Sequence, residues 1–217
     1  MIEKKSTLFY KLLVLLSLLT GIILNIINTK SIISILSYYT LQSNIICFIT
    51  FTAIIISILL KKDYRKSEVY YVVKGGIVIC IFITAIMYQI ALMPYGFHMD
   101  YNFENRYLAN LLVHVVSPLL VILDYFLFDT KGKFKWFYPI IWLFIPLNYI
   151  IYVYTYSLSG GRFYGIGGSR DFAYIFLDYN QIGYISVAKF LIIMTIFILI
   201  ISYMLVLIDK KLGSLKK

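Results

Sequence analysis

The chain has 217 residues, of which 61% are hydrophobic and only 14% charged, and its mean hydropathy is +0.87. Soluble domains are about half apolar and about 25% charged, so this composition excludes an ordinary soluble domain and requires lipid to cover part of the surface. A net charge of +10 would indicate a nucleic-acid partner in a soluble protein. The positions of the basic residues explain it better here, and we expect no nucleic-acid partner.

Six apolar runs along the chain are each long enough to cross a bilayer as a helix. A crossing needs about 20 residues, because each residue advances a helix by about 1.5 Å and the hydrocarbon core is about 30 Å thick. The whole chain, 1–217, is therefore predicted to be one all-α transmembrane domain of six helices, without a separate soluble domain. The runs lie at about 8–27, 38–60, 70–93, 107–128, 136–158 and 183–208.

Lysine and arginine are distributed unevenly between the two sides that these spans define. One side carries 15 of the 20 basic residues, and cytoplasmic loops are the ones enriched in lysine and arginine. The chain is thus predicted to be a multi-pass protein of the plasma membrane with both termini cytoplasmic. The same charges would attract anionic lipid. The residues are Lys4, Lys5, Lys11, Lys61, Lys62, Arg65, Lys66, Lys74, Lys131, Lys133, Lys135, Lys210, Lys211, Lys216 and Lys217.

The longest outer segment, 159–182, contains five glycines together with arginine and aspartate. Such a segment can cap a cavity, or it can be a flexible connector, and the sequence favours neither interpretation. The two cysteines fall in apolar runs, which indicates neither a disulfide framework nor a metal cluster. We expect no metal and no cofactor.

A polar stripe runs along the fourth span, where polar side chains cost free energy unless they face protein or water. At 100° per residue, four polar residues fall within about 40° of one another, and His114 lies about 40° beyond them. Pro118 follows His114 by one turn and is expected to kink the helix. The four residues are Arg106, Asn110, Ser117 and Asp124.

The second span carries a matching polar face made by Thr40, Ser43, Asn44 and Cys47, within about 100° of arc. Counted from the outer start of each span, Asn44 lies about 9 Å deep and His114 about 10 Å deep. Both polar patches are therefore predicted to lie in the outer half of the bilayer, where they could meet.

Three tyrosines lie deeper within the spans than the many at span ends, and they could line a cavity. They are Tyr88, Tyr149 and Tyr152. His114 is the strongest single candidate for function, since a neutral imidazole can act as a general base near neutral pH. Thr40 alone is a weaker candidate, because threonine within a span most often bonds its own helix or a neighbouring one.

Four motifs at these positions resemble those of a known group. Together they are similar to bacterial six-helix membrane proteins of unassigned function. That group is distantly similar to the androgen-induced protein family, which includes the androgen-dependent TFPI-regulating protein. The motifs are Tyr-Thr-Leu-Gln-Ser-Asn at 39–44, Asn-Leu-Leu-Val-His-Val-Val-Ser-Pro at 110–118, Leu-Asp-Tyr at 123–125 and Phe-Leu-Asp-Tyr-Asn-Gln-Ile-Gly at 176–183.

The resemblance implies a threonine hydrolase that cleaves fatty acid esters of hydroxy fatty acids within the membrane. Carried over by position, Thr40 would be the nucleophile and His114 its base, because a hydroxyl needs an adjacent base to attack an ester. Asn44 or Asn110 would hold the developing oxyanion. A lipid ester would enter laterally from the outer leaflet. The remaining candidate substrate-binding residues are Ser43, Arg106, Ser117 and Tyr88.

Two functional hypotheses remain open. In the first, the chain hydrolyses a lipid ester through Thr40 and His114. In the second, it is a non-enzymatic binder or transporter, and the same polar residues hold a lipid headgroup or small molecule. The halves of the chain show no sequence repeat, and the spans lack paired carboxylates, which favours the enzyme over a transporter. Membrane lipid or a lipid ester is the expected partner, and the sequence makes no prediction about oligomers.

Overall fold

The computed structural model describes residues 5–92, 104–165 and 168–215, and 81% of the structure is helical. Six helices are long and apolar enough to cross a membrane, which confirms the predicted number of spans. They are α1 (Lys5–Ile27), α3 (Tyr39–Leu59), α4 (Glu68–Met87) with the π-helical turn η2 (Tyr88–Leu92), α5 (Glu104–Leu111) with the π-helical turn η4 (Leu112–Val116) and α6 (Ser117–Phe128), α7 (Tyr138–Trp142) with α8 (Phe144–Leu158), and α10 (Tyr184–Ser214).

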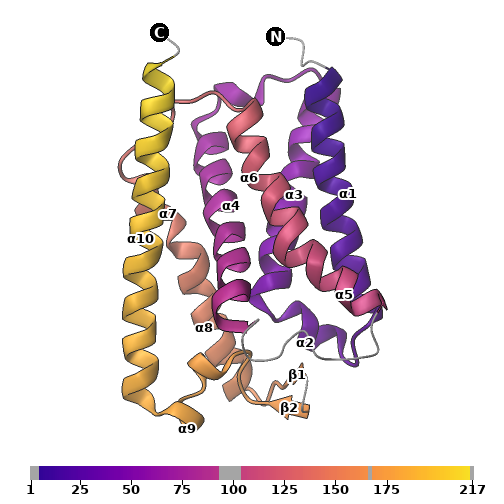
Figure 1. Cartoon of the computed structure of the whole chain (residues 1–217), viewed down its shortest axis with the longest axis vertical. Helices are drawn as coiled ribbons and strands as arrows, with labels where there is room; N and C mark the ends of the chain where they lie inside the picture. The colour runs from indigo at the N-terminus through magenta and orange to yellow at the C-terminus, as the bar shows by residue number, and fades with distance from the viewer. Residues whose placement is uncertain (1–4, 93–103, 166–167, 216–217) are drawn as a thin grey trace.

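Short elements join the long helices and gather at the two ends of the bundle. The start of α1 and the end of α10 lie at one end, called here the terminal end; the opposite end, called the loop end, carries α2, the hairpin and α9 (Figure 1). In the hairpin, β1 pairs antiparallel with β2, with Tyr164 opposite Ser169. The short elements are α2 (Ile32–Leu36), η1 (Tyr64–Lys66), β1 (Phe163–Gly165), β2 (Gly168–Arg170), η5 (Ile175–Leu177) and α9 (Tyr179–Ile182).

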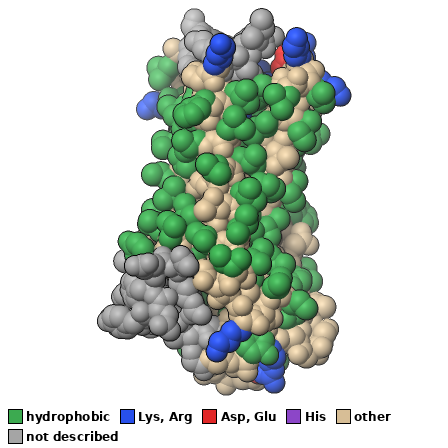
Figure 2. Space-filling model, turned by 90° about the vertical axis from the view of Figure 1, so that its right-hand side faces the viewer, with side chains coloured by type: hydrophobic (Ala, Val, Ile, Leu, Met, Phe, Trp, Pro, Cys, Tyr) green, Lys and Arg blue, Asp and Glu red, His purple; other side chains and the backbone are tan. Residues whose placement is uncertain are grey.

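The sides of the bundle are apolar, and the exposed basic side chains on the face drawn in Figure 2 lie at its two ends. Figure 2 shows hydrophobic side chains covering the length of the molecule on that face, with lysine and arginine above and below. Exposed leucine and isoleucine, such as Leu16 on α1 and Ile196 on α10, supply much of this surface. A surface of this kind is unfavourable in water and suits hydrocarbon. The fold is that of a multi-pass membrane protein.

A cluster of charges lies inside the bundle toward the terminal end. Lys11 of α1 donates to both carboxylate oxygens of Asp124 at 3.0 and 2.9 Å, and Lys74 of α4 donates to the same carboxylate at 2.5 Å. All three side chains are 0% exposed. Asp129 lies 3.4 Å from the Lys74 ammonium and accepts a hydrogen bond from Tyr70. Lys11 and Lys74, which the sequence analysis counted only as topology signals, thus join α1 and α4 to α6.

The packing of α7 on α4 depends on one glycine. A Cβ atom at Gly75 would overlap the indole ring of Trp142. The Trp142 indole N–H donates to the carbonyl of Val72 at 2.8 Å, so the ring is held against the α4 backbone. Asp209 of α10 accepts a hydrogen bond from the hydroxyl of Tyr125 in α6 at 2.7 Å and another from the amide of Phe134 in the loop before α7 at 2.8 Å, so it joins α10 to both.

The charge cluster leads to a stability prediction. The change Asp124→Asn leaves Lys11 and Lys74 without their shared counter-charge in the interior, so we expect it to lower the free energy of unfolding by about 3–5 kcal/mol. The matched change Asp171→Asn breaks a pair with Arg162 that is about half exposed and should cost about 0–1 kcal/mol. Unfolding in detergent, followed by circular dichroism, measures both. Equal losses of unfolding free energy in the two variants would contradict the larger contribution to stability that we expect from the buried cluster.

Candidate functional site

Thr40 and His114 meet inside the bundle near the loop end. Thr40 occupies the first turn of α3, and His114 lies in the π-helical turn η4. The Thr40 hydroxyl oxygen is 3.2 Å from Nε2 of His114, and the two residues are 8% and 7% exposed. The two polar patches, which the sequence analysis left as able to meet, are therefore in direct contact.

The hydrogen bonds around His114 assign its neutral tautomer. Nδ1 lies 3.1 Å from the main-chain carbonyl oxygen of Asn110, which can only accept, so Nδ1 carries the proton. Nε2 is then an unprotonated acceptor that faces the Thr40 hydroxyl. A hydroxyl, a base and a group that orients the base stand in this order at nucleophilic catalytic sites.

The irregular backbone around His114 has a local cause in Pro118. Proline has no N–H to bond the carbonyl four residues earlier, which is that of His114. In the turn before it, the Ser117 amide donates to the carbonyl of Leu112, five residues back, which defines the π-helical turn. The irregularity expected at Pro118 thus takes the form of a wide turn that carries His114, and such turns occur often at functional sites.

Asn44 holds Thr40 and the His114 turn together. Its side-chain amide donates to the carbonyl of Thr40 at 2.8 Å and to the carbonyl of Val113 at 3.1 Å. Ser43 donates to the same Thr40 carbonyl at 2.9 Å, and its hydroxyl oxygen is 2.7 Å from that of Thr84 on α4. Because both amide hydrogens of Asn44 are used, they are not free for an oxyanion in this arrangement. Asn44 and Ser43 position Thr40 instead.

The remaining predicted site residues lie in different places. The Tyr88 ring stacks on the His114 ring, with centroids 4.0 Å apart and planes at 21°. Asn110 contributes its carbonyl, as described above. Ser117 faces α1, where its hydroxyl oxygen is 2.8 Å from that of Ser17, away from Thr40. Arg106 lies in α5, at a position whose side chain falls outside the described part of the structure.

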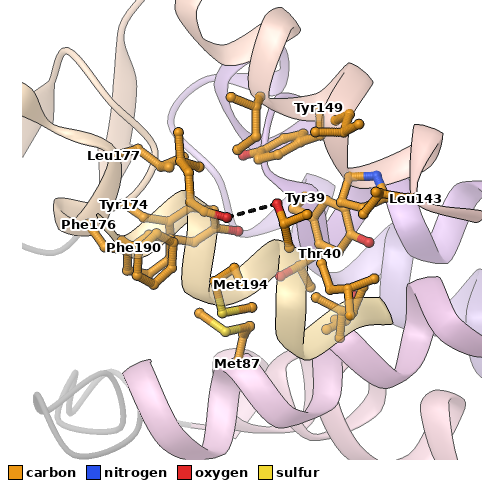
Figure 3. A pocket seen from close by; sticks show the side chains of 18 residues that line it. Tyr39, Thr40, Met87, Leu143, Tyr149, Tyr174, Phe176, Leu177, Phe190 and Met194 are labelled. Carbon is orange, nitrogen blue, oxygen red and sulfur yellow. Dashed lines mark hydrogen bonds between the residues drawn. The ribbon is translucent and has the colours of Figure 1, made fainter. Parts of the chain in front are cut away.

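An apolar cavity of about 140 Å³ lies beside Thr40, and His114 is not among the residues that line it. It is bounded by α3, α4, α8, α10 and residues 174–177, and Thr40 forms part of its wall (Figure 3). Leu147, which is 41% exposed, lines the cavity as well, so the cavity reaches the outer surface of the bundle beside α8. Apolar residues dominate the lining, among them Ile83, Met87, Leu143, Ile150, Phe190, Leu191, Met194 and Ile198.

The described part of the segment 159–182 folds over this cavity, which favours the cap among the two interpretations left open. Phe172 and Leu177 are buried, and Tyr174 and Leu177 line the cavity. The hairpin is bonded to α2 and to the start of α3, because the Tyr164 amide donates to the Ser34 hydroxyl of α2 at 2.7 Å and the hydroxyl of Tyr38, the N-cap residue of α3, donates to the Tyr164 carbonyl at 3.3 Å. Sequence reasoning missed Tyr174; its only signal was an aromatic residue in a glycine-rich segment.

The assigned tautomer of His114 can be tested directly. The chain has two histidines, His98 and His114, so a sample labelled with ¹⁵N-histidine gives two sets of ring signals, and a His98→Gln variant assigns them. We expect His114 to show a protonated Nδ1 and an unprotonated Nε2 at neutral pH. The change Thr40→Val removes the donor to Nε2 and should shift the Nε2 signal. A proton on Nε2 of His114 would contradict the assignment.

The site thus combines a buried hydroxyl–imidazole pair, main-chain groups that orient it, and an apolar cavity that reaches the surface of the bundle. The chain was compared with family models, curated proteins and solved structures. None of the three comparisons finds a match.

Proposed function

We propose that this chain is an intramembrane lipid-ester hydrolase in which Thr40 is the nucleophile and His114 its general base. The observation that carries the proposal is the 3.2 Å contact between the Thr40 hydroxyl and Nε2 of His114, with Nδ1 held by the Asn110 carbonyl. The motifs similar to those of the androgen-induced protein family support the same two roles.

The first half of the proposed reaction transfers the acyl group to the protein. The Thr40 oxygen attacks the ester carbonyl carbon while its proton moves to Nε2 of His114. The resulting tetrahedral oxyanion collapses and breaks the bond between the carbonyl carbon and the alcohol oxygen. His114 gives its proton to that oxygen, the alcohol leaves, and the acyl group remains on Thr40.

The second half releases the fatty acid. A water molecule attacks the acyl-threonine carbonyl and gives its proton to Nε2 of His114. Collapse of this second intermediate returns the proton to the Thr40 oxygen and frees the acid. Tyr88 covers one face of the imidazole and limits its rotation, so that the same nitrogen serves both halves.

The cavity supports a lipid substrate. Its apolar lining favours an alkyl chain, and the exposed edge at Leu147 offers entry from the bilayer beside α8. A cavity of about 150 Å³ holds a benzene-sized group. This cavity therefore accommodates the part of the alkyl chain next to the ester, while the remainder of the alkyl chain extends into lipid. A fatty acid ester of a hydroxy fatty acid is the substrate class that we propose.

We further propose that the chain lies in the plasma membrane with both termini cytoplasmic. The bias in basic residues supports this orientation, and it persists when Lys11, Lys74 and Lys131, which are buried in the structure, are left out. Thr40 and His114, near the loop end, would then lie in the outer half of the bilayer, and substrate would enter from the outer leaflet.

Hydrolysis by the purified protein tests the proposed function. We expect turnover of a fatty acid ester of a hydroxy fatty acid in detergent, and we expect Thr40→Ala and His114→Ala each to lower it at least about 100-fold, since each removes a group that acts in the transition state. Ser117→Ala is the control: it removes a buried hydroxyl that bonds Ser17 rather than Thr40, and turnover should be unchanged. Binding of the ester without cleavage by the wild-type protein would favour the binder or transporter instead.

Orientation is tested by labelling single cysteines with a membrane-impermeant maleimide. The natural Cys47 and Cys80 are buried, so they provide an unreactive background. We expect Ser169→Cys, in the exposed hairpin, to react in intact cells, and Ser67→Cys, in the exposed loop before α4, to react only after permeabilisation. The reverse pattern would place the termini outside.

A further inference from the structure

The hydroxyl of Tyr149 is a buried polar group without a partner. Tyr149 is 6% exposed and lines the cavity beside Thr40. Its hydroxyl lies near that of Tyr174 and near the Tyr39 amide, but it forms no hydrogen bond of normal geometry with either. An unsatisfied buried hydroxyl costs about 1–3 kcal/mol, and such groups in native proteins call for an explanation.

Three other hydroxyls around the cavity already have partners. The Tyr39 hydroxyl donates to the Cys80 carbonyl at 3.4 Å, and the Thr84 hydroxyl is bonded to Ser43. The Thr195 hydroxyl donates to the Leu191 carbonyl of its own helix at 2.8 Å. Among the described residues that line the cavity, Tyr149 is the one whose buried hydroxyl has no hydrogen-bond partner.

Tyr174 places a second hydroxyl next to Thr40. Its phenol oxygen contacts the Thr40 hydroxyl and the main-chain amides of Tyr39 and Thr40. Burial raises the pKa of the Tyr174 phenol, although these hydrogen bonds act in the opposite direction. The group stays protonated at neutral pH and can donate a hydrogen bond.

The start of α3 adds an electrostatic contribution at the same place. The first amides of a helix have no carbonyl within the helix to bond, and they form the positive end of its dipole. The N-cap residue Tyr38 makes no side-chain capping bond. The amides of Tyr39 and Thr40 point toward the two tyrosine hydroxyls instead.

We propose that the hydroxyls of Tyr149 and Tyr174, backed by the first amides of α3, form a subsite that binds the carbonyl oxygen of a lipid acyl group beside Thr40. The lining elsewhere is apolar, so this is the place where the polar end of a bound lipid finds donors. The position of the acyl group rests on the proposed function. In that reaction the same donors face the oxygen that becomes negatively charged when Thr40 attacks.

Binding of a matched ester and ether tests the subsite without any need for turnover. The probes are 1-oleoylglycerol and 1-O-oleylglycerol, which differ by the acyl carbonyl, and each competes with radiolabelled 1-oleoylglycerol for the full-length Thr40→Val protein in nanodiscs. We expect the ester to bind about 10-fold more tightly than the ether, as one or two neutral hydrogen bonds would give. Tyr149→Phe and Tyr174→Phe should each reduce that ratio about 2- to 10-fold and leave the affinity for the ether unchanged.

Tyr152→Phe is the matched control, because Tyr152 bonds Ser37 and does not line this cavity, and it should keep the ratio. The unchanged affinity for the ether shows that each variant is folded. Equal binding of ester and ether, or a ratio that survives in the double variant Tyr149→Phe/Tyr174→Phe, would overturn the proposal. A carbonyl preference in a protein that hydrolyses no ester would refute the hydrolase and leave the subsite standing.

Discussion

The rest of the structure depends on the buried ion cluster of Lys11, Asp124 and Lys74. It fixes α1, α4 and α6 at one relative depth, because a slip of one helical turn, about 5.4 Å, would separate unlike charges inside an apolar bundle. The helix of α6 continues into the turn that carries His114. A charge contact near the terminal end therefore sets the height of the imidazole near the loop end. Asn44 completes the alignment by joining α3 to that turn.

Much of the architecture followed from the pattern of apolar residues. Six runs of sufficient length predicted six long helices, since a span must satisfy its backbone within itself, and the structure has six. The closeness of Asn44 to the turn that carries His114 was within reach of the same reasoning, because depth along a helix follows directly from residue count. The direct contact of Thr40 with His114 was not, since the same count places Thr40 about 3 Å and His114 about 10 Å deep.

The details of the site could not be predicted from the sequence, for two physical reasons. A helical wheel assumes a constant 100° per residue, but the π-helical turn at Leu112–Val116 changes the phase, so Ser117 and Asp124 face α1 while His114 faces α3. Tertiary partners are also invisible along the chain. The sequence analysis counted Lys11 and Lys74 as topology signals and took Asn44 as a possible oxyanion donor. Tyr174 lies in a segment without hydrophobic periodicity.

The attachment of α10 has a consequence for how such a protein can diversify. This helix is joined to the bundle through Asp209 at one end and through η5 and α9 at the other, and between them it packs against α4 and α7 while facing the cavity with Phe190 and Met194. On α10, the residues that face the cavity are thus separate from Asp209, which bonds the helix to the rest of the bundle. Selection for a substrate with a longer, shorter or branched alkyl chain can therefore change residues on the inner face of α10 without disturbing the buried charges that stabilise the bundle.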